Sequence, residues 1–204
     1  MATWTTVYDG SGFWSVAHAE DPGWSGYTFV ATLALAAFSA TGGTQIRLSF
    51  IGSNSAEGFE ANAMWVGNGG GGDVWDFTGD QVQLKQGGSN TISCGGSNAI
   101  IVTDDGIAFV KDATNPLVLA MQFSNSAHDD LGRWNDGGLN YGDSWFKPAV
   151  QEASTQNKSG YTHNVTSNYI YKIELLMGAA DADTKTLTQV TQANVGMQVN
   201  PIGY

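Results

Sequence analysis

The sequence consists of short segments in which apolar and polar residues alternate, and glycine-containing turns separate these segments at close intervals. The segment 45–50, for example, places Ile46, Leu48 and Phe50 at every second position. Because successive side chains of a β-strand point to opposite faces, this period predicts strands with one buried face. No long segment combines the apolar spacing of an amphipathic helix with recognisable caps. The pattern therefore predicts an all-β protein with little or no helix.

Similar segments recur along most of the chain. The turns between them contain Gly-Gly, Asp-Gly and Asn-Pro pairs, which supply the positive or fixed φ that a reversing chain needs. The expected strands are 27–40, 45–50, 61–66, 81–85, 90–94, 99–102, 107–110, 117–123 and 169–175. This number of strands in one chain favours an antiparallel β-sandwich with a jelly-roll-like arrangement over a barrel.

A length of 204 residues corresponds to one domain with short arms. We expect the β-sandwich to occupy residues 27–176. Residues 1–26 are expected to form an aromatic arm or the first strands, and residues 177–204 an arm or an extra strand. The strand periodicity fades between Ser124 and Tyr161, so we expect a long loop there, rich in aromatic and acidic side chains.

The charge of the chain excludes several function classes. Eight lysines and arginines stand against 19 aspartates and glutamates, for a net charge of −11. A protein that follows nucleic-acid phosphates, or that binds an anionic membrane surface, needs an excess of basic side chains. We expect no nucleic-acid partner and no membrane insertion.

Cys94 is the single cysteine, so it forms no intrachain disulfide, and we expect a buried thiol.

Four segments resemble strands and turns of a known β-sandwich module. They are 45–50, 85–93, 101–109 and 117–123, and the resemblance extends over residues 27–176. Modules of this kind occur beside SGNH (GDSL-type) hydrolase domains and in tailed-phage virion proteins. The resemblance implies a β-sandwich and favours a non-enzymatic virion protein, either a capsid decoration or a fibre-like component. Such a protein contacts other virion proteins, such as a capsid or fibre base, and forms homo-oligomers.

Two further observations bear on that hypothesis. The first four residues, Met-Ala-Thr-Trp, lack the basic and apolar regions of a signal peptide, so we expect synthesis in the host cytoplasm and a final location in the virion. Gly142-Asp143-Ser144 matches the nucleophile turn of SGNH hydrolases, but the Asp-x-x-His pair of those enzymes is absent from the sequence. An SGNH-type esterase is therefore the least favoured alternative, and we expect no catalytic residue.

The segment 128–146 suggests a second function. It combines aromatic rings, which can cover the apolar face of a sugar, with carboxylates and amides that can bind its hydroxyl groups. The alternative is a loop that its own aromatic side chains hold on the sandwich. The residues expected to contact a glycan in a carbohydrate-binding adhesion module are Trp134, Asp136, Tyr141, Asp143 and Trp145.

The two ends of the chain carry candidate contacts with partner proteins. An aromatic N-terminal segment and an alternating C-terminal segment can each dock on a neighbouring subunit, and each can equally complete its own sandwich. The candidate contacts are Trp4, Tyr8, Trp14, Leu187, Val190, Val195 and Met197.

Metal and phosphate sites have weak support in the sequence. Acidic pairs such as Asp104-Asp105 could supply oxygen ligands for Ca²⁺, but no segment has the spacing of an EF-hand loop. The three histidines share no zinc-ligand spacing. The glycine-rich segment 67–72 lacks the Lys-Ser/Thr that follows a phosphate-binding loop, so we expect a plain turn. No cofactor is expected.

Overall fold

The structure is a computed structural model of the 204-residue chain. It describes residues 1–14, 18–21, 25–54, 56–123, 131–134, 141–148, 151–164 and 169–178. Within these residues the helical elements are one turn of α-helix, α1 (Ser11–Trp14), and one 3₁₀ turn, η1 (Leu35–Ala37). No helix in this part of the chain has the length and hydropathy to cross a membrane.

The strands form two main antiparallel sheets. The four-stranded sheet has the order β1 (Thr3–Asp9), β13 (Lys172–Met177), β4 (Ile46–Ile51) and β8 (Ile100–Val102). The seven-stranded sheet runs through β12 (Thr162–His163), β11 (Gly142–Pro148), β3 (Tyr27–Leu33), β9 (Leu117–Phe123), β5 (Phe59–Asn68) and β6 (Val82–Gln83), and β7 (Ile92–Cys94) also pairs with β5. A separate pair joins β2 (His18–Asp21) to β10 (Leu131–Trp134).

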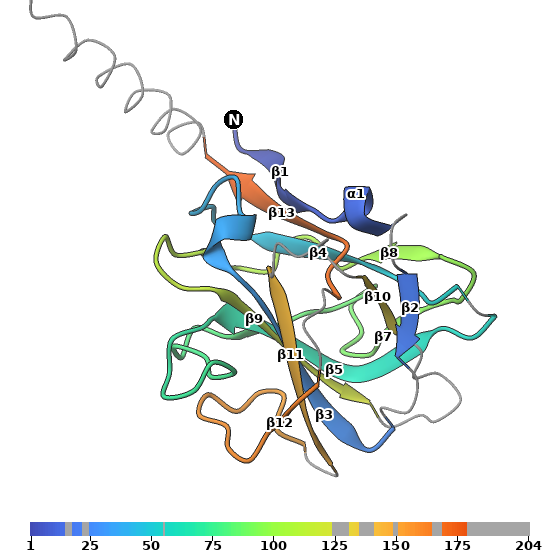
Figure 1. Cartoon of the computed structure of the whole chain (residues 1–204). Coiled ribbons are helices and arrows are strands. Elements are labelled where there is room, and N and C mark those ends of the chain that lie inside the picture. The colour runs from blue at the N-terminus through green and yellow to red at the C-terminus, as the bar shows by residue number, and fades with distance from the viewer. Residues whose placement is uncertain are drawn as a thin grey trace, which may run out of the picture.

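The main core lies between the two sheets. Figure 1 shows β1, β13, β4 and β8 across the top of the molecule, above β3, β9, β11 and β5. Alternate residues of facing strands enter this core, among them Leu48 of β4 and Phe29 of β3. The Phe29 ring packs edge to face against Tyr169 at 4.7 Å between centroids. Burying each large apolar side chain of this kind contributes about 1.5–3 kcal/mol. The prediction of an all-β antiparallel sandwich is confirmed.

A second, smaller core covers the outer face of the seven-stranded sheet. Val30 of β3, Val118 of β9 and Trp145 of β11 point away from the main core and are covered by Phe77 and Tyr161, which come from the segments 69–81 and 151–163. β9 is apolar at consecutive positions, as expected for a strand that is buried on both faces. These two covering segments build the surroundings of the candidate site.

Three expected elements differ in the structure. Residues 107–110 do not form a strand, because they make only isolated bridges such as Gln45 to Ala108. The end of the expected strand 27–40 is instead the 3₁₀ turn η1. Residues 131–134 form strand β10 and residues 142–148 form strand β11, although both segments lie in the stretch expected to be a loop. The two faces of β11 meet different cores, Phe146 the main core and Trp145 the second, so this strand lacks a simple alternation.

Candidate functional site

An open pocket of about 460 Å³ lies at the outer face of the seven-stranded sheet. Four parts of the chain contribute to it. Thr32 comes from β3, the segment 70–74 follows β5, and Pro116 directly precedes β9. The fourth part is the start of β11 with the residue before it, and it contributes Tyr141, Gly142, Asp143 and Trp145. Pockets that bind small ligands commonly have volumes of ~300–1,000 Å³ and a mainly apolar lining with a few polar groups. The size and the composition of this pocket fit that description.

β11 and the residue before it bring together three of the predicted glycan-contacting residues. Tyr141, Asp143 and Trp145 all line the pocket. Asp143 and Trp145 share the outer face because they alternate with residues that face the main core. Trp145 is only 7% exposed. Its ring packs edge to face against Trp75, with 5.8 Å between centroids, so much of Trp145 supports the second core.

The Asp143 carboxylate is held in place from two sides. Its Oδ1 accepts a hydrogen bond from the backbone N–H of Ser144 at 2.9 Å and lies 2.5 Å from Nε2 of His163. The His163 ring also packs edge to face on Trp145, at 5.8 Å between centroids. Both bonds use the same oxygen, so Oδ2 has no hydrogen-bond partner within the described residues and is available to a ligand.

The glycine-rich segment forms a second part of the pocket, and the sequence did not predict this role. The buried Asp76 carboxylate fixes the segment, since it accepts the backbone N–H of Asp73 at 3.0 Å and that of Lys158 at 2.6 Å. A Cβ added at Gly71 would lie 2.3 Å from the Cβ of Asp76, which is too close for any side chain. Glycine at this position therefore allows the segment to pack against the residue that holds it.

A buried polar network holds the end of β5, directly before the glycine-rich segment. Asn68, at the end of β5, donates from its side-chain amide to the Asp80 carboxylate and to the carbonyl of Val110, and its Oδ1 accepts from the backbone N–H of Asp112. The Asp80 carboxylate also accepts the backbone N–H of Asn68 at 3.0 Å. Since buried amides that lose their partners cost about 1–3 kcal/mol, this network holds β5 and the 110–112 segment together.

A buried lysine extends this network. The Lys111 ammonium donates to the carbonyls of Asp112 and Asn115 and lies 3.7 Å from the Asp112 carboxylate. Burial lowers the pKa of Lys111. Burial opposes ionisation of Asp112 as well, but hydrogen bonds from Asn115 and Thr114 and the nearby ammonium together lower the pKa of that carboxyl to about 2.

A second buried lysine supports the aromatic cluster beside the pocket. The Lys158 ammonium lies 3.6 Å from the centroid of the Phe77 ring and donates to the carbonyl of Trp75 at 3.0 Å. Burial lowers the pKa of Lys158 to about 8. Trp75 lies 5.7 Å from Tyr161 between ring centroids, and burial raises the pKa of Tyr161. Lys158 thus connects the segments 69–81 and 151–163 that cover the sheet.

Ser144 lies on the other side of β11. It is fully buried, and its hydroxyl oxygen is 3.5 Å from the side-chain amide nitrogen of Asn164. His163 instead binds Asp143 and packs on Trp145, which are both on the outer face. The strand therefore separates the hydroxyl of Ser144 from the imidazole that an SGNH-type mechanism would need.

The structure places some of the remaining predicted residues and not others. The backbone of Trp134 lies in β10 and that of Trp14 in α1, but their side chains lie outside the described part of the chain. Asp136, Leu187, Val190, Val195 and Met197 also lie outside the described residues. The side chain of Tyr8, another candidate partner contact, is 4% exposed and packs in the main core, so in this fold it offers little surface to a partner.

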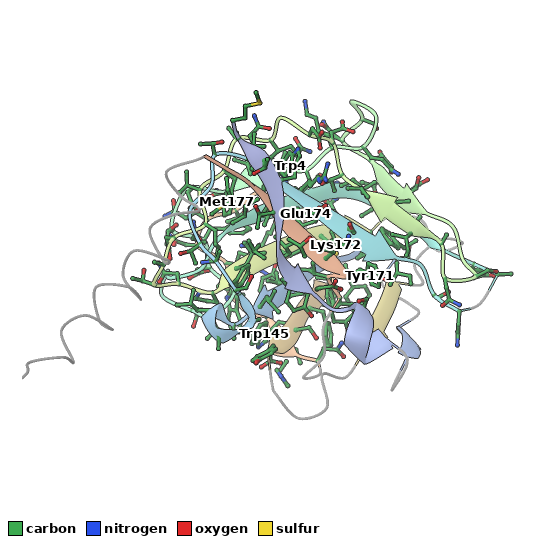
Figure 2. All side chains as sticks on the ribbon, turned by 90° about the horizontal axis from the view of Figure 1, so that it is seen from above. Trp4, Trp145, Tyr171, Lys172, Glu174 and Met177 are labelled. Atoms are coloured by element: carbon green, nitrogen blue, oxygen red, sulfur yellow. The ribbon has the colours of Figure 1, made fainter. Side chains whose placement is uncertain are left out.

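Trp4 lies on the outer face of the four-stranded sheet. The guanidinium of Arg47 lies 4.4 Å from the centroid of the Trp4 ring and donates to Glu174 at 2.8 Å. Seen from above, Figure 2 shows Trp4 and Glu174 over strands β1 and β13, whereas Trp145 lies apart from them. Trp4 is therefore far from the pocket and remains a candidate contact for a partner.

No metal centre is evident in the described residues. They contain no group of three or more His, Cys, Asp or Glu side chains placed to hold a metal ion. The thiol of Cys94 is buried, and burial raises its pKa to about 11, which leaves it protonated and unreactive at neutral pH.

No protein-family model matches the sequence, and no curated protein matches it with significant similarity. The resemblance of residues 27–176 to virion and SGNH-associated modules thus stays a prediction.

Proposed function

We propose that this chain is a non-enzymatic carbohydrate-binding protein, and that the pocket beside β11 is its binding site. The observation that carries this proposal is the presence of Tyr141, Asp143 and Trp145 in one pocket of about 460 Å³. Carbohydrate recognition needs an apolar surface for the C–H face of the sugar and polar groups for its hydroxyls.

The pocket offers both kinds of contact. Val74 is 57% exposed and presents apolar surface to a ligand. Tyr141 is half-buried, and it lines the pocket while it also packs against the main core. Trp145 supports this surface from below. The open Oδ2 of Asp143 can accept hydrogen bonds from sugar hydroxyls, and its position is fixed by His163 and the Ser144 backbone. A site whose polar group is held before binding loses less conformational entropy when the ligand binds.

A glycan array, followed by calorimetry on the sugars retained, tests the proposal. Tyr141→Ala and Asp143→Asn should each weaken binding about tenfold, which corresponds to ~1.4 kcal/mol. Asp105→Asn is the matched control, because Asp105 is exposed and pairs with Arg47 of the four-stranded sheet. Thermal unfolding of each variant checks that the fold persists. If no sugar is retained, or if Asp143→Asn binds as Asp105→Asn does, the proposal fails.

A second candidate function is that of a structural component of a tailed-phage virion, as a capsid decoration or a fibre-like protein. The structural observation that favours it is an exposed apolar edge on the four-stranded sheet. Ile100 and Val102 of β8 are 51% and 46% exposed, and Val110 is 57% exposed. β8 is an edge strand of the four-stranded sheet. The chain that follows β8 continues along the same edge, where Lys111 forms an isolated bridge with Gly42. An apolar sheet edge can pair with a neighbouring chain.

The partner that this edge fits best is a second copy of the chain, because an antiparallel edge pairs with itself by a twofold axis. Light scattering after size-exclusion chromatography should show an oligomer for the wild type, and Val102→Lys should shift it toward the monomer. Val74→Lys is the control, since Val74 is also an exposed valine (57%, against 46% for Val102) but lies in the pocket. A monomer at every concentration, with no affinity for capsids or tails, would exclude the virion role.

A further inference from the structure

Among the residues that the structure describes, the charged side chains that line the pocket are of one sign. They are Asp73 and Asp143, and no lysine or arginine of the described residues lines it. The Asp143 side chain is 37% exposed and Asp73 is exposed, so both carboxylates can act on a ligand. A ligand in this pocket therefore meets negative charge from two parts of the chain.

Two lysines of the described residues lie near the pocket, and both are engaged elsewhere. Lys147, two residues after Trp145, binds Glu152 at 2.9 Å. Lys158 is buried against Phe77 and donates to a backbone carbonyl. His163 lies against Oδ1 of Asp143, and its imidazole carries a positive charge only when protonated. None of these contacts directs a positive charge to the open Oδ2 of Asp143.

We propose that the pocket selects sugars by charge, accepting neutral sugars and excluding those with a carboxylate, sulfate or phosphate group, and that Asp143 is the residue that determines this selectivity. This inference rests on the proposed carbohydrate-binding function. An anionic group placed near Asp143 would face a like charge at a partly desolvated site, where such repulsion is stronger than in bulk water. Exclusion of the wrong ligand by a like charge is a common route to specificity.

The net charge of the whole chain acts in the same direction. With 19 acidic against 8 basic residues, the chain repels an approaching polyanion before contact, and salt screens this long-range part. The contribution of Asp143 acts at short range, so salt weakens it less. Both contributions disfavour uronate-containing and sulfated glycans.

Calorimetry with matched probes tests the selectivity. The probes are neutral glucose and galactose oligomers and the corresponding glucuronate and galacturonate oligomers. The wild type should bind the neutral member of a pair at least tenfold more tightly than the acidic member. Asp143→Asn should reduce this ratio, and Val74→Lys, which places a cation at the pocket, should reduce or invert it. Val102→Lys and Asp105→Asn make the same changes in charge on the other sheet and should keep the ratio.

The outcomes separate this proposal from the one on which it rests. If acidic and neutral oligomers bind the wild type equally, or if Asp143→Asn and Val74→Lys leave the ratio unchanged, the charge selectivity is wrong and the carbohydrate function stands. If none of these oligomers binds and the glycan array retains no sugar, the carbohydrate function itself is wrong. A wild type that prefers the acidic oligomers would overturn the role of Asp143 while confirming a sugar site.

Discussion

Replacement of Lys158 by methionine should remove a pH dependence of stability that the buried ammonium causes. Lys158 is 3% exposed, and its nearest polar contact is the carbonyl of Trp75. Burial lowers its pKa from 10.5 to about 8. Between these two pH values the unfolded chain holds a proton that the native protein has released. Stability must therefore rise with pH in this window, because the unfolded state binds more protons.

The size of the effect follows from the two pKa values. For a single group with a pKa of about 8 in the native protein and 10.5 when unfolded, the free energy of unfolding rises by about 2 kcal/mol between pH 8 and pH 10. Below pH 8 both states hold the proton and the contribution is constant. Above pH 10, tyrosines ionise in the unfolded chain while burial keeps Tyr161 protonated, so stability then falls again.

Urea denaturation of wild type and Lys158→Met from pH 7 to pH 10 measures this contribution. The difference between the two free energies isolates Lys158, since Lys111 is common to both proteins. The methionine variant also loses the hydrogen bond to the Trp75 carbonyl. This loss changes the free energy of unfolding by a similar amount at each pH and leaves its slope against pH unchanged. Lys85→Met, at an exposed position, is the control. If the difference stays flat from pH 8 to pH 10, Lys158 is not a buried ammonium as described.

Three further substitutions test the packing around the pocket and the core. Gly71→Ala should destabilise the protein and weaken sugar binding, because the added Cβ would lie 2.3 Å from the Cβ of Asp76. Gly72→Ala should change stability and binding much less, because the nearest atom to its Cβ is 3.7 Å away. Urea denaturation and calorimetry compare the two variants. Asn68→Ala should cost about 1–3 kcal/mol in urea denaturation, because Asp80 and the Val110 carbonyl lose a buried partner, and a cost near zero would contradict the network. Phe29→Ala should cost about 3–5 kcal/mol, while Val110→Ala at an exposed position should stay within ~0.5 kcal/mol; equal losses would contradict the assignment of the main core.

The sequence predicted the strands that have one buried face and clear turns. Ile46, Leu48 and Phe50 alternate because β4 faces the core on one side only. β11 was not predicted, because its two faces meet two different cores and its first three residues are Gly142, Asp143 and Ser144. The segment 107–110 alternates like a strand but makes only isolated bridges. Alternation of apolar and polar residues indicates that one face of a segment is buried. It does not indicate whether a neighbouring strand is present to pair with that segment.

The candidate site was predicted in part for a similar reason. Tyr141, Asp143 and Trp145 were predicted to contact a glycan because aromatic and acidic side chains occur close together in this part of the sequence. The contribution of Gly70 to Val74 was missed, because it depends on the long-range bond from Asp76 to the backbone of Lys158. His163 was considered only as a zinc ligand and as the histidine of an Asp-x-x-His pair, and it fits neither spacing. Its pairing with Asp143 follows from the register of β11 with β12, which no local pattern encodes.

The double cover of the seven-stranded sheet has a consequence for native-state hydrogen exchange. β3 and β9 pair from Thr28↔Gln122 to Leu33↔Leu117, and each is buried toward the main core and toward the segments 69–81 and 151–163. Solvent reaches their amides only when the covering segments and both neighbouring strands open together. Deuterium should enter β3 and β9 last, at a rate set by global unfolding, and should enter β8 and β12 by local fraying.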